Sequence, residues 1–156
     1  MRPWFASLAT TVATLTLAAA PALAGPAIEK LSTHLYYHDS GAIDEREASG
    51  LQLFNAAIGG GDAKGASGAV VVQVTVTGAE TLAKGAVELV AQTPKKKLLK
   101  QRVSLDDYVV EKGKSVVLPF LIYGTGCDKL TITSNLQDGR KVVEKRTVQL
   151  GFSCSD

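Results

Sequence analysis

Apolar and polar residues alternate one by one through most of the chain beyond residue 68. Between Ala69 and Thr77, valines at the even positions alternate with Gln73, Thr75 and Thr77. A period of two residues is typical of a strand with one buried face. The same pattern recurs in six further segments, at residues 31–38, 85–92, 97–105, 115–123, 129–136 and 142–152. The pattern therefore predicts about seven strands.

The type of sheet follows from the same alternation and from the turns between the segments. Parallel strands are usually buried on both faces and read as continuous apolar runs, whereas antiparallel strands with one wet face alternate cleanly. The connections are too short for crossover helices, and Asp138-Gly139 is a hairpin signal. Pro119 has no N–H to donate, so its strand is expected at an edge or to be bulged. We expect an all-β, antiparallel β-sandwich.

Residues 39–68 do not follow the alternation, and we expect a long irregular segment there. Segments of this length without clear strands are often functional. An apolar stretch within it includes Leu53, Phe54 and Ile58, which are candidate partner-binding residues. Residues 42–49 could form a short helix. The glycine run at 59–62 lacks the spacing and the context of a phosphate-binding loop, so it predicts a turn.

The first 24 residues have the features of a secretory signal peptide. Arg2 supplies a positive start, an apolar run follows, and Ala22-Leu23-Ala24 resembles a cleavage site. The mature chain would be residues 25–156, the size of a single domain. No Cys follows Ala24 to carry a lipid, and no second apolar run is long enough to span a bilayer. We expect a periplasmic or secreted protein that does not span the membrane after cleavage.

Removing residues 1–24 takes away Arg2 and leaves 16 Lys and Arg against 15 Asp and Glu. This balance argues against nucleic acid as a partner, because such proteins carry a marked basic excess. The two cysteines, Cys127 and Cys154, are expected to form a disulfide in an oxidising compartment. The loop that it closes would contribute about 3 kcal/mol of stability in the chain-entropy model. Redox activity, metal ligation and intermolecular pairing are the alternatives.

Two segments could carry binding chemistry. His34 and His38 form a candidate copper or zinc site, with Asp39 as the candidate third ligand. In a straight strand the two histidines would lie about 13 Å apart, so a bend would be needed. The run at 95–102 is basic, and it either guards an edge strand against aggregation or binds an acidic partner. The residues concerned are Lys96, Lys97, Lys100 and Arg102.

No catalytic arrangement emerges from the sequence. There is no G-x-S-x-G elbow, and the adjacent carboxylates Asp106 and Asp107 would point apart in a strand or turn. We therefore expect a protein without enzymatic activity and without a cofactor.

The strands at 70–77 and 87–91, together with the closing hairpin from Gly126 to Cys154, resemble the immunoglobulin-like and fibronectin-type-III-like sandwiches of exported bacterial proteins. The resemblance covers residues 67–154 and concerns architecture. The Cys-Trp-Cys core of antibody domains is missing, because the one Trp is Trp4. Such folds host many functions. The leading hypothesis is an interaction module that binds a partner protein or an envelope component, and the alternative is a periplasmic metal-binding protein.

The signal peptide and the disulfide together predict the mass of the exported protein. Intact mass spectrometry is expected to give a chain that starts at Gly25 and is two hydrogens lighter than its reduced form. A mass that does not change on reduction, or that includes residues 1–24, would contradict these expectations.

Overall fold

The computed structural model describes residues 25–56, 59–62, 65–108, 111–125 and 128–154. Within these ranges the side chains of residues 54–56, 59–62, 65–66, 68 and 153–154 are not described. The described residues form strands and two short 3-10 helices. No helix among them is long and apolar enough to cross a membrane.

All seven strands expected from the alternation are present. They are β1 (Ala27–Tyr37), β5 (Gly65–Thr77), β6 (Gly85–Gln92), β7 (Lys97–Ser104), β8 (Val116–Tyr123), β9 (Leu130–Asp138) and β10 (Lys141–Leu150). Four short strands join them, namely β2 (Ala42–Ile43), β3 (Leu53–Ala56), β4 (Gly59–Asp62) and β11 (Phe152–Cys154). The 3-10 turns are η1 (Ala48–Gly50) and η2 (Ala79–Thr81).

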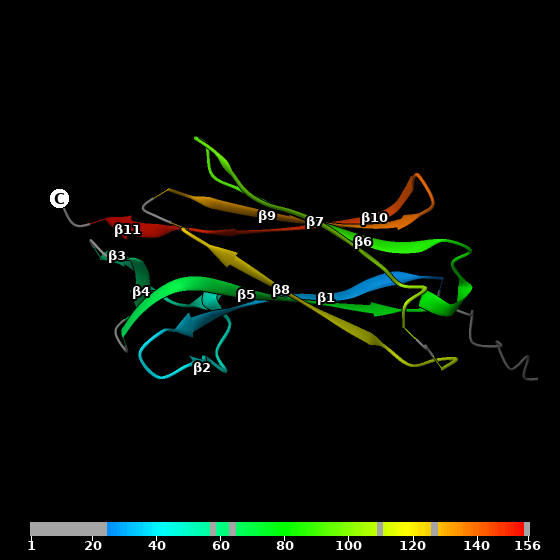
Figure 1. Cartoon of the computed structure of the whole chain (residues 1–156), viewed down its shortest axis with the longest axis horizontal. Helices are drawn as coiled ribbons and strands as arrows, with labels where there is room; N and C mark the ends of the chain where they lie inside the picture. The colour runs from blue at the N-terminus through cyan, green and yellow to red at the C-terminus, as the bar shows by residue number, and fades with distance from the viewer. Residues whose placement is uncertain (1–24, 57–58, 63–64, 109–110, 126–127, 155–156) are drawn as a thin grey trace, which may run out of the picture.

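The strands form two sheets that stack on one another (Figure 1). In the larger one, sheet A, the order is β11-β3-β4-β5-β1-β2, and β8 pairs with β5 on the side away from β1. Sheet B has the order β10-β9-β6-β7. All pairings are antiparallel except that of β11 with β3. The chain is therefore all-β and folds as the expected sandwich.

The core lies between the sheets because in each long strand every second residue is mostly apolar and faces the opposite sheet. In β5 the valines at 70, 72, 74 and 76 are at most 1% exposed, and β6, β8 and β9 contribute side chains buried to a similar degree. Each such side chain contributes roughly 1.5–3 kcal/mol when it leaves water. A bulge between Ala91 and Gln92 lets Leu98 and Leu99, two consecutive residues of β7, both pack against this core.

The segment expected to be irregular is more ordered than the sequence suggested. Residues 39–68 contain β2, η1, β3, β4 and the start of β5. The short helix that the sequence allowed at 42–49 is replaced by β2 and by the first residues of the 3-10 turn η1. Glycines at 59–61 form a strand that pairs with β3, so the expected glycine turn is also corrected. These strands are two to four residues long, too short for an alternation to be recognised.

The hairpin at Asp138-Gly139 is present. Gly139 has φ +60°, and Lys141 lies opposite Asp138, so the loop is Gly139-Arg140 with glycine in the position that a type II′ turn requires. A bulge between Val142 and Glu144 then brings Leu150 opposite Leu130. Cys127 and the side chain of Cys154 lie outside the described residues, as do residues 1–24, so the disulfide and the signal peptide stay predictions.

The core contains one hydroxyl on β1 that predicts a stabilising substitution. Thr33 is 1% exposed, and its Oγ1 has no hydrogen-bond partner among the described residues. Because an unpaired buried hydroxyl is costly, Thr33→Val is expected to raise the free energy of unfolding by about 1 kcal/mol. Urea unfolding measures this difference.

Thr131→Val is the matched control, because Thr131 is a half-buried strand residue whose substitution brings the same change in β-propensity. If Thr33→Val stabilises no more than Thr131→Val does, the Thr33 hydroxyl has a partner after all.

Candidate functional site: the outer face of sheet A

The face of sheet A that points away from the core is unusually apolar. The strand register aligns its side chains in rows across β8, β5, β1 and β2. One row runs from Tyr123 through Ala69 and Tyr36 to Ile43, and the next runs from Leu121 through Val71 to His34. Two further rows begin at Pro119 and Val117. We call this surface the outer A face; its residues are Ser32, His34, Tyr36, Ile43, Ala69, Val71, Gln73, Thr75, Val117, Pro119, Leu121 and Tyr123.

Large apolar side chains are exposed on the outer A face. Of the seven such side chains in the described part of the chain, four lie here: Ile43 at 49% exposed, Val117 at 52%, Leu121 at 37% and Tyr123 at 59%. The Val117 row ends, beyond Thr75, at the one charged residue of the four rows, Lys30, whose ammonium pairs with the Glu47 carboxylate. The other residues of these rows are uncharged. Contiguous exposed apolar surface rimmed by polar groups marks interaction sites on soluble domains.

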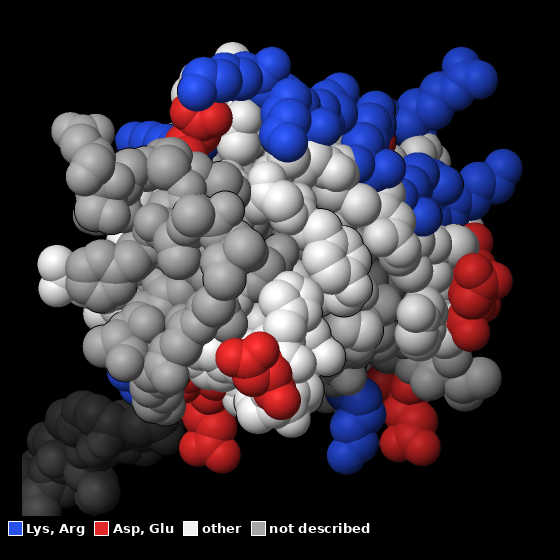
Figure 2. Space-filling view, turned by 60° about the vertical axis from the view of Figure 1, so that its left-hand side comes forward, with Lys and Arg blue, Asp and Glu red and all other residues white. Residues whose placement is uncertain are grey.

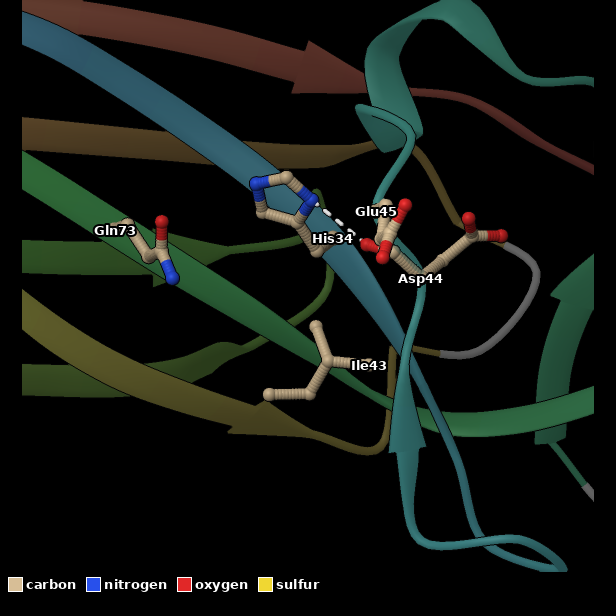
Figure 3. Close-up of a pocket in the computed structure, with 5 residues that line it drawn as sticks. All are labelled: His34, Ile43, Asp44, Glu45 and Gln73. Carbon is tan, nitrogen blue, oxygen red and sulfur yellow. Dashed lines mark hydrogen bonds between the residues drawn. The ribbon is translucent and has the colours of Figure 1, made fainter.

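A shallow hollow lies at the β2 side of this face. It is lined by His34, Ile43, Asp44, Glu45 and Gln73 (Figure 3). His34 and Gln73 rise from β1 and β5, and Ile43 points toward the same hollow from the segment that follows β1 (Figure 3). The hollow therefore combines an apolar wall with an imidazole, an amide and a carboxylate.

His34 fixes the backbone beside the hollow. Its Nδ1 lies 2.9 Å from the carbonyl oxygen of Asp44 and 3.2 Å from that of Arg46. Carbonyl oxygens accept hydrogen bonds and cannot donate them, so Nδ1 carries a proton. In the neutral ring Nε2 is then the atom with the lone pair, and it can accept a hydrogen bond from a bound partner.

Asp44 is the anchor of the segment that lines the hollow. Its side chain is 1% exposed and accepts hydrogen bonds from the Tyr37 hydroxyl at 2.7 Å and from the Arg46 backbone at 3.0 Å. The Arg46 guanidinium also donates to both carboxylate oxygens. Arg46, helped by Tyr37, holds the pKa of the Asp44 carboxyl well below its usual range, against the opposing effect of burial. No motif or periodicity in the sequence indicates this network.

The two histidines of the candidate metal site make contacts with different residues. His34 lies on β1, whereas His38 lies in the turn after it, and the Tyr36 ring packs edge-to-face against His38 with the ring centroids 5.3 Å apart. His34 already uses Nδ1 for the carbonyls of Asp44 and Arg46. Among the residues that the structure describes, no group of three or more His, Cys, Asp or Glu is placed to hold a metal ion. A copper or zinc site at His34 and His38 stays a prediction of the sequence alone.

The candidate partner-binding residues of the 39–68 segment divide into two groups. Leu53 is 2% exposed and belongs to the core, where it lies opposite Phe152 of β11. Its side chain is therefore not accessible to a partner. This corrects the expectation that it contacts a partner. The Phe54 side chain and Ile58 lie outside the described residues.

The basic candidates lie on the other sheet. Lys96, Lys97, Lys100 and Arg102 are all exposed on β7 or on the turn before it. Thr93 shapes that turn, because its Oγ1 accepts hydrogen bonds from the N–H groups of Lys95 and Lys96 at 3.3 and 3.2 Å. Because β7 belongs to sheet B, these cations do not lie on the outer A face.

Comparisons with known proteins add little. No family model matches the chain, and no curated protein matches its sequence. Among solved structures, one described as a β-galactosidase from Bacteroides fragilis aligns with a TM-score of 0.40 and 13% identity. The alignment covers 66% of this chain and 16% of that one, so the chain spans about a sixth of its length.

The Asp44 network predicts a pH-dependent contribution to stability. Asp44→Asn is expected to lower the free energy of unfolding by roughly 2 kcal/mol at pH 7, because it removes the charge that Arg46 and Tyr37 bind. The folded-state pKa lies below the unfolded value, so this contribution is complete above about pH 5 and is lost as the pH falls through 4 and below. Urea unfolding at pH 7, 5 and 3 measures the difference.

The control is Arg46→Gln, alone and combined with Asp44→Asn. Because the two groups interact directly, the double variant should be less destabilised than the sum of the two single variants. A difference between the wild type and Asp44→Asn that stays constant from pH 7 to pH 3 would contradict the assigned role of the carboxylate.

Proposed function

We propose that the chain is an exported, non-enzymatic interaction module that binds a partner protein through the outer A face. The observation that carries the proposal is the apolar surface formed by Val117, Leu121, Tyr123 and Ile43. The cores of protein–protein interfaces are depleted in charged residues and enriched in aromatic ones. The outer A face has this composition, with His34 and Gln73 to give specificity through hydrogen bonds.

The face supports this proposal better than the edge of the sheet does. Strand β8 has one hydrogen-bonded neighbour among the described strands, β5, so its other edge is open. Pro119 lies opposite Gln73 in the middle of an unbroken register. Since proline has no N–H, regular pairing with β5 is retained if its nitrogen is directed to the open edge. An added strand would then lack one hydrogen bond at its centre, so we assign the partner to the face.

Site-specific photo-crosslinking tests the proposal in cells that export the protein. A photo-reactive side chain in place of Leu121 is expected to give a discrete crosslinked product with another envelope protein. Excess mature wild-type protein should suppress the product. Excess Leu121→Ser/Tyr123→Ser protein should not, because an interface loses roughly 2 kcal/mol or more when a central anchor is removed.

The matched control places the photo-reactive group at Val142, which is 48% exposed but lies on β10 of sheet B. Equal crosslinking from positions 121 and 142 would show that the outer A face is not selective. A product of twice the chain mass would identify a second copy as the occupant and would contradict a separate partner protein.

A further inference from the structure

The outer face of sheet B has the opposite character to the outer A face. Its edge strands β7 and β10 turn four cations outward, Lys97, Lys100, Arg102 and Lys145, whereas Lys141, Glu144 and Arg146 stand opposite the inward positions of β9. In Figure 2 the Lys and Arg side chains gather along the upper side of the molecule, where Figure 1 places sheet B. The near-neutral chain therefore concentrates positive charge on this sheet.

The register aligns these charges around a polar centre. One row across the sheet runs Arg102, Glu88, Asn135, Lys145, and the neighbouring row runs Lys100, Val90, Thr133, Thr147. A third row runs Lys97, Gln92, Thr131, Gln149. We call this surface the outer B face. Cations thus line the β7 edge, Lys145 stands at the β10 edge about 14 Å away, and hydroxyl and amide groups fill most of the space between.

One carboxylate stands within the outer B face. Glu88 pairs with Lys100 at 3.2 Å, and Arg102 donates to the Gln137 side chain at 3.2 Å. Lys97 and Lys145 are exposed and have no ion pair with any described residue. These two cations remain available to an anionic ligand.

We propose that the outer B face binds an anionic polysaccharide, with carboxylate or sulfate groups at the Lys and Arg side chains and sugar hydroxyls at the Thr, Asn and Gln side chains. Charge complementarity selects a negative ligand, and the polar centre selects a hydroxyl-rich one. A membrane surface fits less well, because a face that inserts into a bilayer places apolar side chains among its cations. The one half-buried apolar side chain in the three rows is Val90, and the exposed Val142 lies toward the hairpin end.

Dextran sulfate is the probe, with unsulfated dextran as the uncharged control, and binding of the mature protein is measured at about 150 mM salt. We expect binding to dextran sulfate alone. Lys97→Gln/Lys145→Gln should weaken it about tenfold, since two exposed charge contacts together correspond to about one factor of ten. The matched control is Lys112→Gln/Lys114→Gln, which removes the same charge from the exposed residues that precede β8 and should change the affinity less than twofold.

A third variant distinguishes a weakened binding site from an unfolded protein, because it is expected to raise the affinity. Glu88→Gln removes the carboxylate of the face and releases Lys100, so it should tighten binding severalfold. Equal losses in the two lysine double variants, or no binding to dextran sulfate, would overturn the proposal. Stronger binding to vesicles of anionic phospholipid that Val142→Ser/Val143→Ser abolishes would overturn it too, in favour of a membrane surface.

Discussion

Strand β5 is buried along most of its length because it has a hydrogen-bonded neighbour on each side and sheet B against one face. Its inward valines are at most 1% exposed, and its first residues, Gly65–Ser67, pair with β4 before β8 takes over at Ala69. One long strand therefore holds together the central part of sheet A and its β3–β4–β11 end. The positions of β1 and β8, and hence of the outer A face, depend on this pairing.

The open sides of the sandwich are closed by different means. Next to β1, the Asp44 network and the Lys30–Glu47 ion pair at 2.6 Å hold the segment that carries Ala48 into the core. The Glu144 carboxylate on β10 accepts a hydrogen bond from the backbone N–H of Ile28 at 2.6 Å, which links the two sheets directly. These contacts join residues distant in the sequence or depend on a two-residue strand. Contacts of these two kinds produce no periodic pattern in the sequence, so they could not be predicted from it.

The sequence predicted the long strands because a two-residue period repeated over eight or more positions is unambiguous. The outer A face was not predicted from the sequence, although β8 carries a signal for it. In β8 the alternation places Val116, Leu118, Phe120 and Ile122 on the core side. The residues between them and after them, Val117, Pro119, Leu121 and Tyr123, are apolar as well. A strand with a wet face should carry polar residues there. Apolar residues on both faces of an edge strand are therefore the signal that could have found the site.

The two outer faces differ because nothing in the fold constrains them. A sandwich needs only its inner faces to be apolar, so the outer faces can diverge without cost to the core. On sheet B the outward positions follow the expected polar pattern and add a one-sided excess of cations. On sheet A the outward positions depart from this polar pattern, above all in β8. Because the two faces point in opposite directions from a shared core, a protein bound to the outer A face would leave the outer B face accessible. This geometry suits a module that connects a partner protein to an anionic polymer, and it requires no conformational change between the two sites.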